Sequence, residues 1–199
     1  MIGVEKRNGL SYAGIGSRKT PKDIQKMMIQ IGSMYASLGY VLHTGGAQGA
    51  DDAFASGHGF IAPLNKEIFL PWDNFNSKTI QETTTTIGVS MEAYAIARKY
   101  YKHPDKNKTW NDLKSATKKL MARNTYQILG PTLNKPVEFV VCWTPDGKEI
   151  GGTSQAIRMA NSLQIPVFNL GKKEHLALMN KALTKFHDKC AEAIMESNI

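Results

Sequence analysis

Short apolar segments that end near glycine and run into helical patterns recur along this chain, and this alternation constrains its fold more than any other feature. The predicted strands cover residues 10–15, 40–43, 67–70, 137–143 and 165–170. Strands that alternate with helices form a parallel sheet with helices on both faces. We therefore predict an α/β, Rossmann-like, doubly wound fold with a mainly parallel sheet of about five to seven strands.

Helical spacing fills most of the segments between these strands. Ile24, Met27, Met28 and Ile31 recur at intervals of three and four residues, which places them on one face of a helix. Similar patterns occur after residue 90, at 110–129, after Gly152 and at 174–196. Residues 72–86 are polar and irregular instead, and predict a surface excursion near the ligand.

Composition narrows the class of protein. No repeat or linker divides the chain, so residues 1–199 are expected to form one domain, with a basic helical insertion at about 90–130. Hydrophobic residues make up 42% and charged residues 21%, as in ordinary globular domains. Apolar runs fall far short of the roughly 20 residues that cross a bilayer, and the first residues lack a secretory signal. We expect no membrane partner and a cytoplasmic location.

The cysteines and histidines do not indicate a metal. Cys142 and Cys190 are the two cysteines, and neither lies at the spacing of zinc ligands. We therefore expect neither a metal site, nor a disulfide framework, nor a bound cofactor.

Positive charge is concentrated in one central segment. Between Arg98 and Arg123 stand nine of the 25 lysines and arginines, against two acidic residues, in a chain of net charge +8. With Tyr100, Tyr101 and Trp110 interleaved, the segment resembles a surface for single-stranded DNA, where cations contact phosphates and aromatic rings stack on bases. A solvated helix face with core aromatic residues explains the same pattern, so both interpretations stay open.

Three glycine turns carry residues suited to a phosphate-bearing ligand. Glycine lets the backbone approach a phosphate closely, and the helix that follows presents unpaired N–H groups and its positive dipole end. None of the turns matches the dinucleotide fingerprint or the Walker pattern, and a tight turn needs glycine whatever it binds. The candidate nucleotide contacts in the turns are Gly14, Gly16, Ser17, Arg18, Thr44, Gly45, Gly46, Gly49, Gly151, Gly152, Thr153 and Ser154.

Three further residues are candidates for ligand contacts. Arg123 and Asn124 are predicted to contact phosphate or ribose, because an arginine buried on an apolar stretch needs an anionic partner. Trp143 ends the most apolar strand, where it either walls a base-binding pocket or belongs to the core.

These motifs together resemble the SLOG superfamily. The resemblance rests on Gly14–Arg18, His43–Asp51, Trp143–Gly147 with Gly151–Thr153, and on Met121–Gly130. The superfamily groups the Rossmann-like domain of the DNA-processing protein DprA with the LOG nucleotide phosphoribohydrolases, and this chain is most similar to phage-encoded DprA-like members. The resemblance implies a partner that is a nucleotide or a nucleotide-derived small molecule, and a homodimer.

The resemblance leaves three functions open. LOG enzymes cleave the N-glycosidic bond of a nucleoside 5′-monophosphate with a glutamate, and Gln155 stands at the matching position, which weakens the enzyme interpretation. Asp51, Asp52 or Glu92 would have to act as the acid instead, although Asp51 also suits a helix cap and Glu92 a solvated face. The alternatives are a DprA-like mediator that binds single-stranded DNA, and a sensor or sequestering protein for a nucleotide signal that performs no catalysis.

Overall fold

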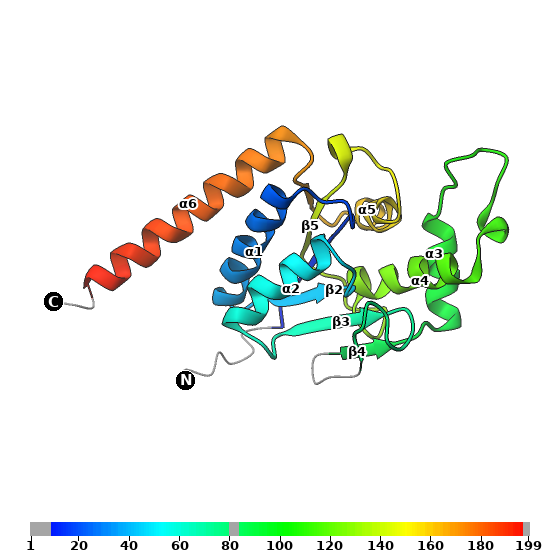
Figure 1. Ribbon diagram of the computed structural model, residues 1–199, viewed down its shortest axis with the longest axis horizontal. Helices are drawn as coiled ribbons and strands as arrows, with labels where there is room; N and C mark the ends of the chain where they lie inside the picture. The colour runs from blue at the N-terminus through cyan, green and yellow to red at the C-terminus, as the bar shows by residue number, and fades with distance from the viewer. Residues whose placement is uncertain (1–8, 80–83, 197–199) are drawn as a thin grey trace.

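The computed structural model describes residues 9–79 and 84–196 and contains a six-stranded, all-parallel sheet (Figure 1). The strand order is β4-β3-β2-β1-β5-β6, and every neighbouring pair is parallel. The strands are β1 (Ser11–Gly16), β2 (Val41–Thr44), β3 (Lys66–Leu70), β4 (Thr84–Ile87), β5 (Phe139–Trp143) and β6 (Val167–Asn169). This architecture confirms the predicted Rossmann-like, doubly wound fold.

Strand β1 lies at the centre of the sheet because its side chains are apolar or small on both faces. Residues 11–15 are all buried, and Tyr12 pairs with Leu42 of β2 on one side and with Phe139 of β5 on the other. Alternate residues of a strand point to opposite faces, so Tyr12 and Ala13 enter different cores.

One face of the sheet is covered by α1 (Lys22–Ser37), α2 (Ala50–Ile61) and α6 (Lys173–Glu196). The apolar face predicted from the helical spacing is the face that α1 buries, through Met27, Met28 and Ile31. Tyr12 anchors this core, with its ring stacked 5.6 Å from Phe139.

The opposite face is covered by α3 (Met91–Tyr100), α4 (Ser115–Leu129) and α5 (Thr153–Ser162). The short helices η1 (Trp110–Asp112) and η2 (Pro145–Gly147) lie in the connections before α4 and α5. Helix α4 packs directly on β1, β2 and β3, so part of the basic segment belongs to the layer that covers the sheet. This placement brings the carboxyl-terminal half of α4 over the strand ends.

Sequence and structure differ at the edges of the sheet. Strand β4 (Thr84–Ile87) begins in the segment 72–86, for which no strand was predicted, and ends one residue beyond it. Residues 80–83 of that segment lie outside the described part of the chain. The sequence there contains four consecutive threonines, a polar run that does not predict a strand. The strand forms because it pairs with β3. The last strand is also shorter than predicted, Val167–Asn169 instead of 165–170.

The chain reverses its direction of travel across the sheet between β1 and β5. From β1 it adds β2, β3 and β4 on one side, and it then returns to place β5 and β6 on the other. In open parallel sheets, the loops diverge at such a reversal and leave a crevice at the carboxyl ends of the strands. Among the described helices, none combines the length and the apolar character that a membrane span needs.

Candidate functional site

A cavity of about 560 Å³ opens at the carboxyl ends of β1 and β5, where the strand order reverses. Its wall is formed by the loop after β1, the beginning of α2, the inner side of α4 and the beginning of α5. The residues that line it are Ile15, Gly16, Ser17, Arg18, Lys19, Ala47, Asp51, Phe75, Thr117, Leu120, Met121, Arg123, Asn124, Gln127, Pro145, Ile150, Gly151, Gly152, Thr153 and Ala156.

Arg123 is a buried cation with unused hydrogen-bond donors in this wall. Its side chain is 5% exposed, and its Nε and Nη1 atoms donate no hydrogen bond within the described part of the chain. Its charged neighbour is Asp51, with Nη1 at 3.5 Å from Oδ2, and the ring of Phe75 lies 5.8 Å from Cζ. Burial lowers the pKa of Arg123, which means that the site disfavours the charged form. A buried guanidinium with unused hydrogen-bond donors is costly, and an anion in the cavity would offset that cost.

The backbone leaves room for this guanidinium only because residue 45 is glycine. A Cβ atom at Gly45 would collide with Nη1 and Cζ of Arg123 and would come within 2.7 Å of Nε2 of Gln127. Gly45 therefore positions the arginine without itself lining the cavity.

Asp51 is the one acidic side chain among the described residues that line the cavity. It lies in the first turn of α2, is 3% exposed, and accepts a hydrogen bond from the Ala47 N–H at 3.2 Å. Burial raises the pKa of Asp51 to about 6, although Arg123 and the Ala47 N–H act in the opposite direction. A carboxyl group of this kind exchanges a proton near neutral pH, which suits a general acid as well as a ligand contact.

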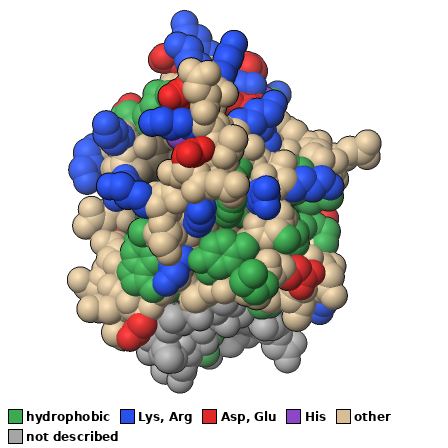
Figure 2. Space-filling model, turned by 90° about the vertical axis from the view of Figure 1, so that its right-hand side faces the viewer, with side chains coloured by type: hydrophobic (Ala, Val, Ile, Leu, Met, Phe, Trp, Pro, Cys, Tyr) green, Lys and Arg blue, Asp and Glu red, His purple; other side chains and the backbone are tan. Residues whose placement is uncertain are grey.

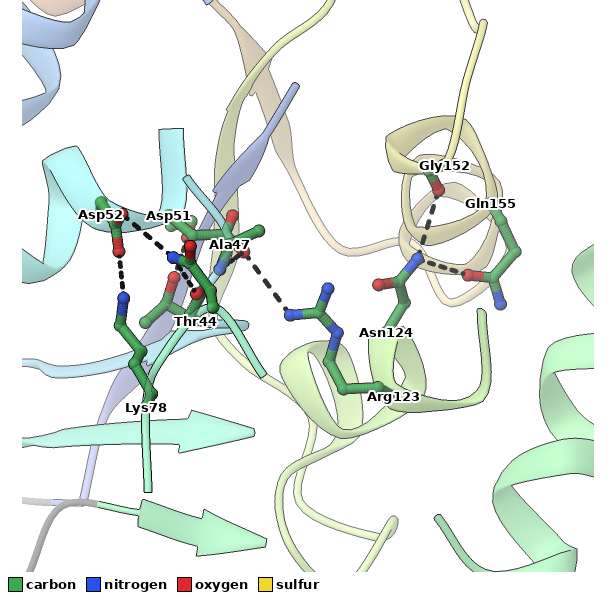
Figure 3. Close-up of polar contacts among 12 residues, drawn as sticks. Thr44, Ala47, Asp51, Asp52, Lys78, Arg123, Asn124, Gly152 and Gln155 are labelled. Atoms are coloured by element: carbon green, nitrogen blue, oxygen red, sulfur yellow. Dashed lines mark hydrogen bonds and ion pairs between the residues drawn. The ribbon is translucent and has the colours of Figure 1, made fainter. Parts of the chain in front are cut away.

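Asn124 and Gln155 form a buried amide pair beside Arg123 (Figure 3). The Nδ2 atom of Asn124 donates to the carbonyl oxygen of Gly152 at 3.2 Å and to Oε1 of Gln155 at 3.1 Å. Gln155 is 1% exposed and is held behind the wall, whereas Asn124 reaches the cavity. The side chain of Gln155 is therefore occupied in orienting a neighbour.

Two backbone corners complete the wall. The loop after β1 carries Gly16, Ser17 and Arg18, and its other side is packed against Gly49, whose φ of +86° and closeness to the Ser17 carbonyl favour glycine. Helix α5 begins at Thr153, directly after Gly151 and Gly152, so its positive dipole end faces the cavity.

Several candidates lie behind or away from the wall. Gly14 and Thr44 hold the strand ends together, since the Thr44 hydroxyl donates to the Gly14 carbonyl at 2.8 Å. The Gly46 carbonyl accepts from Asn76, and the Ser154 hydroxyl donates to the Gly151 carbonyl at 2.7 Å. These four residues shape the site from outside the cavity.

Trp143 and the two other acids also lie off the wall. Trp143 packs against the core under α1, α2 and α6, because it shares the strand parity of Phe139. Asp52 forms an ion pair with Lys78 at 2.7 Å, and Glu92 is exposed in the first turn of α3.

One face of α4 contributes residues that the sequence analysis did not single out. Thr117, Leu120, Met121 and Gln127 line the cavity together with Asn124. Their spacing of three and four residues was a detectable signal, because it marks one helix face. Phe75, from the irregular segment before β4, had no such signal.

The remainder of the basic segment lies on the surface. Eight of its nine cations are exposed or half-buried, and Figure 2 shows Lys and Arg gathered around the upper part of this face of the molecule. A second hollow of about 380 Å³ lies here, with the rings of Tyr101 and Trp110 5.6 Å apart. It is lined by Arg98, Tyr101, His103, Lys108, Thr109, Trp110 and Asn111.

Comparison with known proteins identifies the fold and leaves the family open. No family model matches the chain, and no curated protein matches it. The single-stranded DNA-binding DNA processing protein A from Helicobacter pylori has a similar structure, with a TM-score of 0.51 and 16% identity over 92% of this chain and 81% of that chain. The Moco carrier protein of Chlamydomonas rheinhardtii aligns with a TM-score of 0.49 and 14% identity, over 88% and 84% of the two chains. The chain thus shares the Rossmann-like fold of DNA processing protein A.

Proposed function

We propose that the cavity binds a nucleotide through its phosphate, as expected for a SLOG-type protein. The observation that carries this proposal is Arg123, a buried residue, 5% exposed, on the cavity wall, whose Nε and Nη1 atoms donate no hydrogen bond to any residue that the structure describes. Charge-assisted hydrogen bonds from arginine to phosphate are among the strongest polar contacts in proteins. The beginning of α5 and the exposed Arg18 at the same cavity add further positive potential.

The remaining wall suits the rest of a nucleotide. A cavity of about 560 Å³ falls within the range that small-molecule ligands occupy. Phe75, Leu120, Met121 and Ile150 supply apolar surface for a base, while Asn124 and Asp51 supply polar atoms for a sugar. We therefore favour a nucleoside 5′-monophosphate or a related nucleotide as the ligand.

Hydrolysis of the N-glycosidic bond is the finer form of this proposal. Asp51 is the acid that the geometry favours, because it lies in the cavity with a pKa of about 6, whereas Glu92 and Asp52 lie elsewhere. In this reaction Asp51 would activate a water or stabilise charge on the ribose, and Arg123 would hold the phosphate. The non-catalytic alternative, a sensor or sequestering protein, needs the same contacts without turnover, and a phage origin remains a proposal from the resemblance.

A nucleotide panel tests these proposals. Calorimetric titration of the wild-type protein with nucleoside 5′-monophosphates should show binding, and Arg123→Met should weaken it by about a hundredfold or more. Arg158→Met, which removes a cation outside the cavity, serves as the matched control. Equal affinity in the wild type and in Arg123→Met would refute the phosphate site. Free base detected by chromatography, and lost in Asp51→Asn, would support hydrolysis; tight binding without base release would favour the sensor.

Single-stranded DNA binding is the second candidate, and the hollow between Tyr101 and Trp110 is the observation that favours it. Aromatic rings beside Arg98 and Lys108 are suited to stacking on bases and contacting phosphates. DNA processing protein A, which has a similar fold, binds single-stranded DNA.

Charge reversal tests the DNA candidate. Changing Lys114, Lys118 and Lys119 to Glu should abolish salt-dependent binding of an oligonucleotide. The control makes the same charge change at Lys181, Lys185 and Lys189 of α6, on the opposite face. Equal binding by both variants, or no binding by the wild type, would exclude this surface as the DNA site. Light scattering of the same samples tests the expected homodimer.

A further inference from the structure

We propose that Asn124 is a specificity-determining residue that selects a ligand with a free sugar hydroxyl near its phosphate, that is, a free nucleoside 5′-monophosphate in preference to a residue within a DNA strand. The inference rests on the proposed binding of a nucleotide and names the class of ligand. The feature that carries it is the fixed orientation of the Asn124 amide at the cavity wall.

The orientation of this amide is determined by an unambiguous acceptor. Nitrogen and oxygen of an asparagine side chain are assigned from their partners, and a backbone carbonyl only accepts. The Gly152 carbonyl lies 3.2 Å from the amide of Asn124, so that atom must be Nδ2. Both hydrogens of Nδ2 are then used, one on Gly152 and one on Oε1 of Gln155.

Gln155 is the positioning residue of this arrangement. Its Oε1 atom accepts from Asn124, which leaves its own Nε2 atom buried and without a hydrogen-bond partner in the described part of the chain. If the Gln155 amide were turned over, its Nε2 group would face the Nδ2 group of Asn124. Two donors would then meet, and neither would gain a hydrogen bond. The Gly152 carbonyl therefore orients both amides.

The Oδ1 atom of Asn124 is left as a free acceptor. It takes part in none of the hydrogen bonds found among the described residues, and Figure 3 shows it on the side of the amide that faces Arg123. The side chain is 7% exposed and lines the cavity. An acceptor in this place is open to a donor from the ligand.

A phosphate cannot supply that donor, because its ionised oxygens only accept. Asn124 and Arg123 both line the cavity, and Oδ1 of Asn124 lies on the side that faces Arg123 (Figure 3), so the donor lies on the part of the ligand nearest the phosphate. In a nucleoside 5′-monophosphate the nearest donors are the hydroxyls of the ribose, whereas the base lies farther along the molecule. A residue inside a DNA strand has neither hydroxyl free, since its 3′ oxygen is esterified and its 2′ position carries hydrogen.

The test compares sugars that differ by one hydroxyl. Adenosine 5′-monophosphate and its 2′-deoxy and 3′-deoxy analogues are titrated into the wild type, Asn124→Ala, Gln155→Leu and the control Asn161→Ala. One neutral hydrogen bond corresponds to about a five- to tenfold change in affinity. The wild type and Asn161→Ala should lose that factor on removal of one of the hydroxyls. Asn124→Ala should bind all three nucleotides alike, and Gln155→Leu should reduce the preference, because the Asn124 amide is then held by the Gly152 carbonyl alone.

Each contrary outcome has one meaning. Equal affinity of the wild type for all three nucleotides, or a preference that persists in Asn124→Ala, would overturn the role of Asn124 while the phosphate site stands. A wild-type preference for the adenine compound over inosine 5′-monophosphate that disappears in Asn124→Ala would assign Oδ1 to the base and overturn the sugar assignment. Absence of binding by every nucleotide would refute the proposed function itself.

Discussion

Adding one methyl group at Gly45 should abolish phosphate binding with little effect on folding. Gly45 does not have a positive φ, so alanine fits the backbone there, but its Cβ would occupy the position of the Arg123 guanidinium. The guanidinium is the end of a flexible side chain and can move, so Gly45→Ala should lower the free energy of unfolding by only about 1–2 kcal/mol. Two charge-assisted hydrogen bonds to the ligand, each worth about 1.5–3 kcal/mol, would be lost, which corresponds to a hundredfold weaker Kd or more.

Calorimetric titration with a nucleoside 5′-monophosphate and urea denaturation of the same samples measure the two effects. Gly59→Ala, on α2 and away from the cavity, is the matched control, because its Cβ would meet only the tip of the flexible Lys66 side chain. In the Gly45→Ala background, Arg123→Met should cost almost no further affinity, since the arginine is already displaced. Wild-type affinity in Gly45→Ala, or a full additional loss from Arg123→Met, would refute the reasoning.

Three further predictions concern stability. The raised pKa of Asp51 means that the folded state holds its proton more tightly than the unfolded state. The free energy of unfolding of the wild type, relative to that of Asp51→Asn, should therefore fall by about 3 kcal/mol as the pH rises from about 4 to 6 and stay level above. A difference that is constant with pH in urea denaturation would contradict this. Gly49→Ala should lower Tm by at least about 4 °C, because the residue has a φ of +86° and its Cβ would lie 2.8 Å from the Ser17 carbonyl, whereas Gly88→Ala, at a φ of +89° in open space, should lower it less in the same thermal scan. Phe54→Ala removes a fully buried ring and should cost about 3–5 kcal/mol in urea denaturation, and a loss below 1 kcal/mol would show that the core there is not close-packed.

The order of strands and helices was predictable from the sequence because its signals are local. Apolar runs, glycine turns and the three- and four-residue spacing of Met27, Met28 and Ile31 each act within a few residues. The parallel sheet follows from their alternation, and five of the six strands were placed. The exception, β4, is a polar edge strand whose formation depends on pairing with β3, an interaction that no local pattern encodes.

The site was predictable as a set of turns, and only the tertiary structure decided which residues face the cavity. Trp143 turns into the core and Arg123 into the cavity, yet both are single residues on mainly apolar elements. The sequence shows a glycine at position 45 and an arginine at position 123, far apart along the chain. That the glycine makes room for this cation follows from the crossing of α4 over the ends of the strands. Such a contact is a property of packing between distant segments, and it exists only once the sheet and the helix have come together.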